Sequence, residues 1–109
     1  MYGQRINIID LIDMCNLAKS RSDAKLLIRG DAVTVDQQGV IDGERYKVKS
    51  IGETVDVLVW TTLKIGKFRT ASYEHVVENG SEYAGWVVKD IKHPDANHLV
   101  KCETIIAEA

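Results

Sequence analysis

Residues 15–35 read Cys-Asn-Leu-Ala-Lys-Ser-Arg-Ser-Asp-Ala-Lys-Leu-Leu-Ile-Arg-Gly-Asp-Ala-Val-Thr-Val. The apolar residues in the middle of this stretch recur at the spacing of one helical face, namely Ala24, Leu27 and Ile28. Ser20 is a typical N-cap residue, and Gly30 follows the last turn in the position of a C′ glycine. Beyond Gly30 the apolar period changes from about 3.6 to about 2, which is typical of a strand. The stretch therefore predicts a helix over 20–29 and a strand over 32–35.

Similar patterns extend on both sides of this stretch. Upstream, Asn7 can cap a helix over 7–17, whose apolar face consists of Ile8, Leu11, Ile12 and Cys15. Downstream, a turn over 36–39 and alternating residues predict a series of short strands: 40–41, 44–49, 55–60 and 63–65. We expect the helices to pack on these strands through the following residues: Leu11, Ile12, Leu27 and Ile28 against Val33, Val35, Val57 and Val59. The result is an α+β fold, with two short N-terminal helices on a small, bent, mainly antiparallel sheet.

The charge balance changes along the chain near residue 70. Residues 1–70 carry 11 lysines and arginines against nine acidic residues, whereas residues 71–109 carry three against seven. We therefore expect an N-terminal domain over 1–70 and an acidic, β-rich extension over 71–109. Ser72 to Glu78 fits a helical turn or a strand, while 83–91 and 99–106 predict two strands of a hairpin. This extension should lie away from the basic residues.

Composition excludes several classes of protein. With 109 residues and 45% apolar side chains, the chain is long enough for one domain with a buried core. No apolar run approaches the ~20 residues that span a bilayer, and the N-terminus does not have the pattern of a secretory signal. We therefore expect no membrane partner and a cytoplasmic location. Cys15 and Cys102 are isolated in sequence and are expected to be small buried apolar residues.

No residue pattern indicates an active site, a cofactor or a metal. His93 and His98 flank a proline-containing loop and lack further ligands at metal-binding spacing. The spacing of Gly80 and Gly85 matches the two glycines of a phosphate-binding loop. However, Trp86 and Val87 occupy the positions where that loop requires lysine and serine or threonine. We therefore expect that the protein is not an enzyme and binds no cofactor or metal ion.

Basic residues form three groups that could contact nucleic acid. The first surrounds the predicted helix over 20–29 and combines cations with hydroxyls near the helix N-terminus: Lys19, Ser20, Arg21, Ser22, Lys25 and Arg29. The second flanks Gly66 and Phe68, and comprises Lys64, Lys67 and Arg69. The third, Arg45, Lys47 and Lys49, is better explained as the lysine-rich edge of a sheet. A solvated outer helix face is the alternative explanation for the first group.

The stretch from Ile9 to Val35 resembles the small RNA-binding domain named after ribosomal protein S-four. That domain has a short helix, then a helix with a ser-arg-ser-glu-ala-arg segment, then a gly-x-val-x-val strand. The segment corresponds to Ser20, Arg21, Ser22, Asp23, Ala24 and Lys25. Residues 62–67 are also similar to the closing strand of the version at the C-terminus of bacterial tyrosyl-tRNA synthetases, so that the family's glycine-lysine pair corresponds to Gly66 and Lys67. Leu26 stands where the family commonly has a second arginine.

This resemblance implies a non-catalytic module that binds structured RNA, either tRNA or rRNA. The contacts would go to the backbone and to the shape of the RNA rather than to base sequence. Two alternatives remain open. The same fold could bind a partner protein through Trp60, Trp86 and exposed strand edges, or the chain could be an appendage of a larger RNA-handling enzyme.

Overall fold

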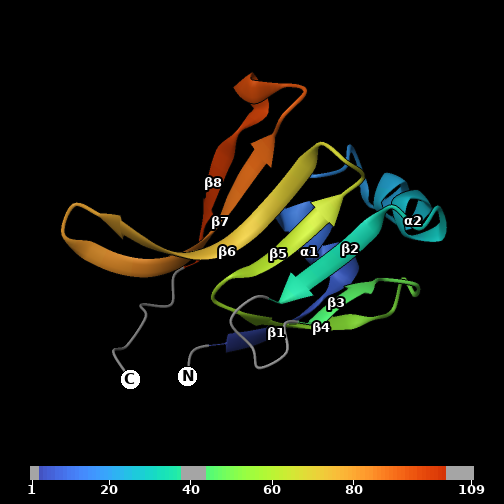
Figure 1. The fold of residues 1–109 in the computed structure, drawn as a ribbon, viewed down its shortest axis with the longest axis horizontal. Coiled ribbons are helices and arrows are strands. Elements are labelled where there is room, and N and C mark those ends of the chain that lie inside the picture. Colours follow the sequence, from blue (N-terminus) through green and yellow to red (C-terminus); the bar gives the residue numbers. More distant parts are fainter. Residues whose placement is uncertain (1–2, 38–43, 103–109) are drawn as a thin grey trace.

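The structure is a computed structural model that describes residues 3–37 and 44–102 (Figure 1). Its elements follow one another in this order: β1 (Gly3–Asn7), α1 (Ile8–Met14), α2 (Arg21–Arg29), β2 (Val33–Gln37), β3 (Glu44–Lys47), β4 (Thr54–Leu58), β5 (Thr61–Ile65), β6 (Arg69–Glu78), β7 (Ser81–Asp90), the short helix η1 (Pro94–Ala96) and β8 (His98–Lys101). Two helices and a mainly antiparallel set of strands confirm the predicted α+β class.

The strands form two sheets, in which the described strand pairs are antiparallel. The larger sheet has six strands in the order β3-β2-β5-β6-β7-β8. The smaller one pairs β1 with β4. Strand β1 was not predicted from the sequence, because a strand that pairs with a distant segment has no local turn signal to reveal it.

Strand β6 crosses the position of the expected domain boundary near residue 70. It pairs with β5 on one side and with β7 on the other. Ala71, Tyr73 and Trp86, which lie on β6 and β7, are fully buried in the same core as the helix residues. Residues 71–102 therefore continue the sheet, and a separate folding unit over 1–70 stays a prediction.

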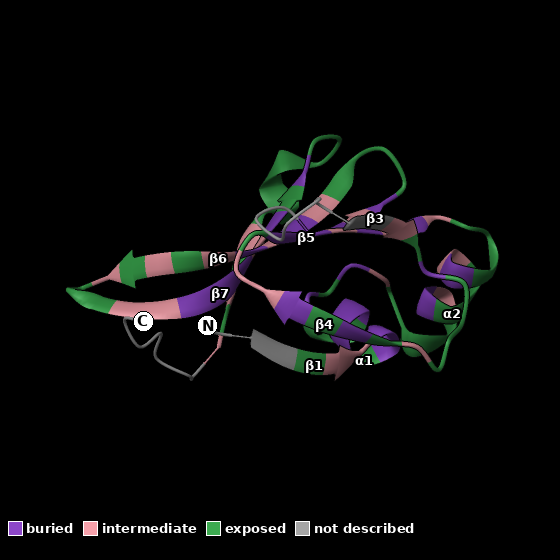
Figure 2. Ribbon diagram, turned by 60° about the horizontal axis from the view of Figure 1, so that its bottom comes forward, coloured by how far each residue is buried: buried purple, intermediate pink, exposed green. Residues whose placement is uncertain are grey.

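The hydrophobic core lies on one side of the six-stranded sheet. Alternate residues of β2 and β5 are buried there, and the register places Val33 opposite Ile65 and Val35 opposite Leu63. Figure 2 shows α1, α2 and the β1–β4 pair on this side of the sheet. Within α2, Ala24 and Ile28 are fully buried, while Leu27 is only partly buried against the core. Among the elements of residues 3–37 and 44–102, none packs on the opposite face of β2 and β5, which we call the open face.

Local capping explains where both helices begin, although α1 ends at Met14, earlier than the expected end at residue 17. The Asn7 side chain accepts hydrogen bonds from the backbone N–H groups of Ile9 and Asp10, so α1 begins at the next residue. The Ser20 hydroxyl accepts the N–H of Asp23 at 3.2 Å and starts α2 as predicted. The helix ends at Arg29 as predicted, with Gly30 as its C-cap, but the expectation that Gly30 is the C′ glycine was wrong. Its φ is −86°, and the left-handed residue that ends α2 is the following Asp31, with φ 57°.

The remaining sequence expectations concern turns and the C-terminal strands. Strand β2 continues to Gln37, so the expected turn begins later than residue 36. The segment 72–78, for which a helical turn was also open, is strand. The expected return strand over 40–41 and the end of the expected strand over 99–106 lie outside the described residues. In the part of the chain that the structure describes, the helices are too short to cross a membrane.

Candidate nucleic-acid interface

Arg21 begins α2 and points toward α1. Its guanidinium donates to Asp10 and lies 3.5 Å from a carboxylate oxygen of Asp13. The hydrogen bond to Asp10, followed by the two nearby carboxylate charges, raises the pKa of Arg21 above its ordinary value. About half of each side chain stays exposed, with 52% for Arg21 and 53% for each aspartate. Arg21 is therefore accessible to solvent, but much of its charge is already neutralised.

Lys25 and Arg29 follow Arg21 at successive intervals of four residues, so they share its side of α2. Both side chains are exposed. Among the described residues neither forms an ion pair. This flank of the helix therefore carries two available positive charges, those of Lys25 and Arg29, while Arg21 is paired with α1.

An open hollow of about 410 Å³ lies along the other flank of α2. It is lined by the residues that precede α2, by one side of the helix, by its C-terminal link and by the start of β6: Ala18, Lys19, Asp23, Leu26, Leu27, Gly30, Ala32 and Arg69. The rim combines two cations that are distant in sequence, Lys19 and Arg69. The structure thus divides the predicted helix group between two flanks of α2.

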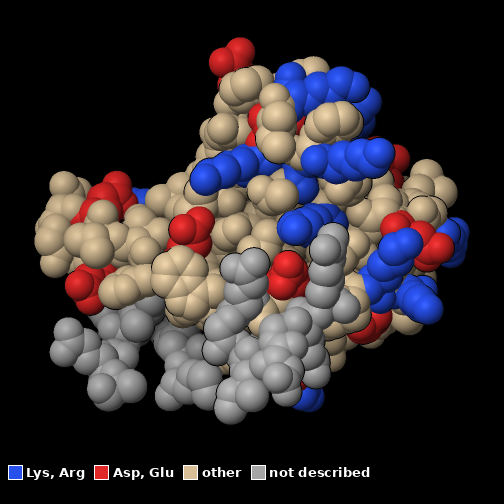
Figure 3. Space-filling view, in the orientation of Figure 1, with Lys and Arg blue, Asp and Glu red and all other residues tan. Residues whose placement is uncertain are grey.

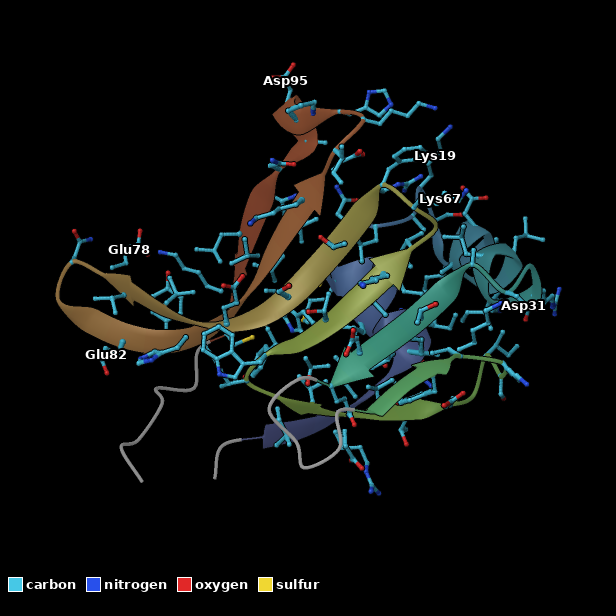
Figure 4. All side chains as sticks on the ribbon, viewed as in Figure 1. Lys19, Asp31, Lys67, Glu78, Glu82 and Asp95 are labelled. Atoms are coloured by element: carbon cyan, nitrogen blue, oxygen red, sulfur yellow. The ribbon has the colours of Figure 1, made fainter. Side chains whose placement is uncertain are left out.

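The turn between β5 and β6 is fastened to the segments at both ends of α2. The N–H of Gly66, whose φ is 62°, donates to the carbonyl of Ala32 at 2.8 Å. The Arg69 guanidinium donates to the carbonyl of Leu17 in the segment between α1 and α2. These two bonds hold the exposed Lys67 near the edge at which Lys19 lies (Figure 4). The predicted second basic group therefore meets part of the first.

Ser20 and Ser22 have different local roles. The Ser20 hydroxyl already accepts the cap hydrogen bond from Asp23, whereas Ser22 is exposed on the first turn of α2. Unpaired backbone N–H groups at a helix N-terminus favour an anion, and a nearby hydroxyl can donate to it. Ser22 is the hydroxyl whose oxygen is not used by the cap.

Lys64 lies apart from both flanks of α2, on the open face of β5. Its ammonium is 4.0 Å from a carboxylate oxygen of Asp36 on the neighbouring strand β2. Within the β5–β6 turn, Phe68 is 47% exposed, and the Lys92 ammonium stands 5.3 Å from its ring centroid. Lys92 could not be predicted from the sequence, because the pairing of β6 with β7 and the hydrogen bond between the Ile91 N–H and the Phe68 carbonyl bring the two loops together.

Charge is unevenly distributed over the molecule. On the face seen in Figure 3, lysine and arginine side chains gather over the middle of the sheet and toward the helices. The far end of the β6–β7 hairpin carries Glu78 and Glu82, which we call the acidic arm. Figure 4 shows Glu78 and Glu82 at the end of the molecule opposite Lys19 and Lys67. A net charge of −2 therefore conceals a basic region.

The two tryptophans of the protein-binding alternative differ sharply in their exposure to solvent. Trp86 is fully buried and packs against Tyr73, with ring centroids 5.0 Å apart, so its expected role in a surface contact was wrong. Trp60 is 57% exposed in the turn between β4 and β5. Its φ of 79° is a strained value for a bulky residue.

Burial affects both cysteines, and backbone carbonyls contact the ring of His98. Burial raises the pKa of the Cys15 thiol to about 12, and burial also raises the pKa of Cys102. The two ring nitrogens of His98 lie 2.9 and 3.0 Å from the carbonyl oxygens of Ala96 and Cys15. Within the described ranges, 3–37 and 44–102, no group of three or more potential ligands is arranged to hold a metal ion.

Comparison with known proteins gives no relative. No protein-family model matches the chain, and no match is found among curated proteins or solved structures.

Proposed function

We propose that this protein is a non-catalytic RNA-binding module of the S-four type, which contacts the backbone of structured RNA such as tRNA or rRNA. The single observation that carries the proposal is the attachment of the β5–β6 turn to both ends of α2. Through it, Lys67 and Arg69 join Lys19 near the N-terminal end of α2, whose first turn also carries the exposed Ser22. Cations and a free hydroxyl at such a terminus are the groups that bind phosphate oxygens.

The chemistry of these groups favours backbone contacts. Lysine ammonium groups act as point charges toward phosphates and carry no information about base sequence. Structured RNA presents phosphates and 2′-hydroxyls at its surface, while its deep major groove is closed to side chains. A rigid helix end and a fastened turn suit recognition of such a fixed shape.

The distribution of acidic residues is compatible with this use. The acidic arm extends away from Lys19 and Lys67 (Figure 4), and exposed charges separated by more than about 8 to 10 Å are largely screened at physiological ionic strength. Asp23 lies in the hollow, where its N–H takes part in the cap of α2. The RNA backbone would therefore approach from the side of Lys19 and Lys67.

Titration of fluorescently labelled tRNA and of an rRNA fragment over a series of salt concentrations tests the proposal. The wild-type protein should bind both RNAs, more weakly as salt rises. The double variant Lys19→Gln and Lys67→Gln should weaken binding to both alike. The slope of log affinity against log salt should lose roughly 1.4 to 1.8 in magnitude, at about 0.7 to 0.9 for each lost phosphate contact.

A matched control removes two cations elsewhere. Arg5→Gln and Lys101→Gln change the net charge equally, but these residues are paired with Asp56 and Glu78 at other places on the surface. This variant should retain the wild-type slope. Absence of RNA binding by the wild type at low salt, or an equal loss of slope in both double variants, would refute the proposal.

Trp60 supports protein binding as a second candidate function. Exposed tryptophans are enriched at the centres of protein interfaces, and this one is held in a strained turn. Affinity capture with the wild type and with Trp60→Gly would test this candidate, because glycine accepts the positive φ without strain. A partner retained by both forms would exclude Trp60 as its binding residue.

A further inference from the structure

A row of lysines crosses the open face of the six-stranded sheet. The strand register places five residues directly opposite one another on successive strands, and they are, in order, Lys47, Thr34, Lys64, Thr70 and Lys89. Residues directly opposite in antiparallel strands project from the same face. The lysine row, defined as Lys47, Lys64 and Lys89, therefore lies on one surface although its members are far apart in sequence.

The face that carries the row is not covered by other described elements. Residues adjacent in sequence to those of the row, among them Val33, Leu63 and Val88, are buried on the opposite side of the sheet with the helices. Lys47 and Lys89 are exposed, and Thr34 and Thr70 are partly exposed. Figure 3 shows basic side chains over this part of the sheet.

Protection of sheet edges explains only one member of the row. Lysines commonly guard edge strands against pairing with other chains. Lys47 lies on β3, which is an edge strand, but β5 lies between β2 and β6, and β7 lies between β6 and β8. Lys64 and Lys89 therefore need a different explanation.

The spacing and the short side chains between the lysines suit an extended polyanion. Adjacent strands lie about 4.8 Å apart, so successive lysines in the row are roughly 10 Å apart. Threonines occupy the positions between them, and Thr62 and Ser72 form a 3.2 Å hydroxyl contact on the same face. Such a flat surface lets a nucleic-acid backbone approach closely, and its hydroxyls can donate to phosphate oxygens.

The charges of the row are only slightly neutralised. Lys64 meets Asp36 at 4.0 Å, and that carboxylate is just 14% exposed. Within the described residues, Lys47 and Lys89 form no ion pair. An open positive surface of this kind is complementary to a chain of phosphates.

We propose that the open sheet face is a second RNA-contact surface, on which the lysine row binds the phosphodiester backbone across the strands. This inference rests on the proposed RNA-binding function and extends it from the helix end to the sheet. Lys64 precedes the β5–β6 turn by a few residues, so the row is continuous with Lys67. One RNA can then follow both surfaces.

The variant Lys47→Gln and Lys89→Gln tests the row without leaving Asp36 unpaired. With the same labelled tRNA and rRNA fragment, it should weaken binding several-fold and lower the magnitude of the salt slope by roughly 1.4 to 1.8. Combined with Lys19→Gln and Lys67→Gln, the losses in slope should add, because each lysine would contact a different phosphate of the same RNA. Arg5→Gln with Lys101→Gln is again the matched control, and circular dichroism checks that each variant folds.

Lysine acetylation of the wild-type protein, read by mass spectrometry, gives a measurement that needs no variant. Bound tRNA should protect Lys47 and Lys89, whereas Lys101, paired with Glu78 on the acidic arm, should react as in the free protein. Polyglutamate at equal charge concentration serves as the acidic-protein competitor. If it binds the row more tightly than RNA does, the row is a protein-binding surface and the inference is wrong.

The two proposals fail in different ways. Wild-type protein that binds no RNA at low salt refutes the proposed function, and the inference with it. Wild-type protein that binds RNA, loses slope with Lys19→Gln and Lys67→Gln, and retains it with Lys47→Gln and Lys89→Gln refutes only the sheet surface.

Discussion

The α2 surface and the open sheet face both carry basic residues, but they differ in how the charges are paired. On α2, Arg21 lies against two aspartates of the preceding helix, while Lys25 and Arg29 form no ion pair among the described residues. On the sheet, only Lys64 of the lysine row meets an acidic residue, at 4.0 Å. The arginine of a conspicuous basic motif in a sequence can therefore be paired with acidic residues, while lysines scattered along the chain form a largely unpaired positive surface.

The two surfaces depend on a common core, so the largest effect should come from a change beneath both. Ile28→Ala removes a fully buried side chain of α2 and should cost about 2 to 5 kcal/mol of unfolding free energy. Hydrogen exchange should show amides of α2 and β5 losing protection together. Leu27→Ala, at a partly buried position, should cost less.

That prediction can also separate the two surfaces. If Ile28→Ala exposes the amides of α2 while those of β5 keep their protection, the helix is a local unit with a stability of its own. The sheet surface would then persist without the helix surface, and their dependence on one cooperative core would be refuted.

A smaller effect should be confined to the helix surface. Ser20→Ala removes the hydroxyl that accepts the N–H of Asp23 and caps α2, and it should cost ~1 kcal/mol of stability. It should also weaken RNA binding, because a frayed first turn no longer orients the N–H groups and Ser22 toward a phosphate. Denaturant unfolding with an unchanged m-value and RNA titration measure the two consequences.

Ser22→Ala is the natural comparison for that variant. Its hydroxyl is exposed and does not cap the helix, so stability should change by no more than about 0.5 kcal/mol. RNA affinity should nevertheless fall if Ser22 donates to the backbone. An equal loss of stability in both variants would contradict the assignment of the cap to Ser20.

Sequence patterns were most informative where the deciding interactions are local. The caps at Asn7 and Ser20 and the helical apolar spacing predicted both helices, because each depends on residues within one or two turns. The exception was the end of α2, where Asp31 rather than Gly30 adopts the left-handed conformation. Aspartate tolerates that conformation better than most residues, and spacing alone does not choose between two adjacent candidates.

The candidate site was harder to predict because it depends on contacts between distant segments. Nothing near Lys89 in the sequence indicates that it lies in register with Lys64, and β1 is recognisable only through its pairing with β4. Likewise, Arg21 matches a basic motif, yet its pairing with Asp10 depends on the angle at which α1 meets α2. A sheet register or an interhelical ion pair depends on tertiary structure, so the periodicity of the sequence does not predict it.

The smallest expected effect sharpens the comparison between paired and available charge. Asp10→Asn removes the main partner of Arg21, so its guanidinium becomes free to reach a phosphate. RNA affinity at low salt should rise, and the salt slope should gain roughly 0.7 to 0.9 in magnitude if one further phosphate contact forms. Asp56→Asn is the matched control, since it frees Arg5 from a similar exposed pair on β1 and β4. A general change of net charge would alter both variants alike, whereas a local contact at α2 alters only the first. If Asp10→Asn leaves the slope unchanged while Lys19→Gln and Lys67→Gln reduce it, RNA contacts the flank of α2 that faces the β5–β6 turn and not the flank that faces α1.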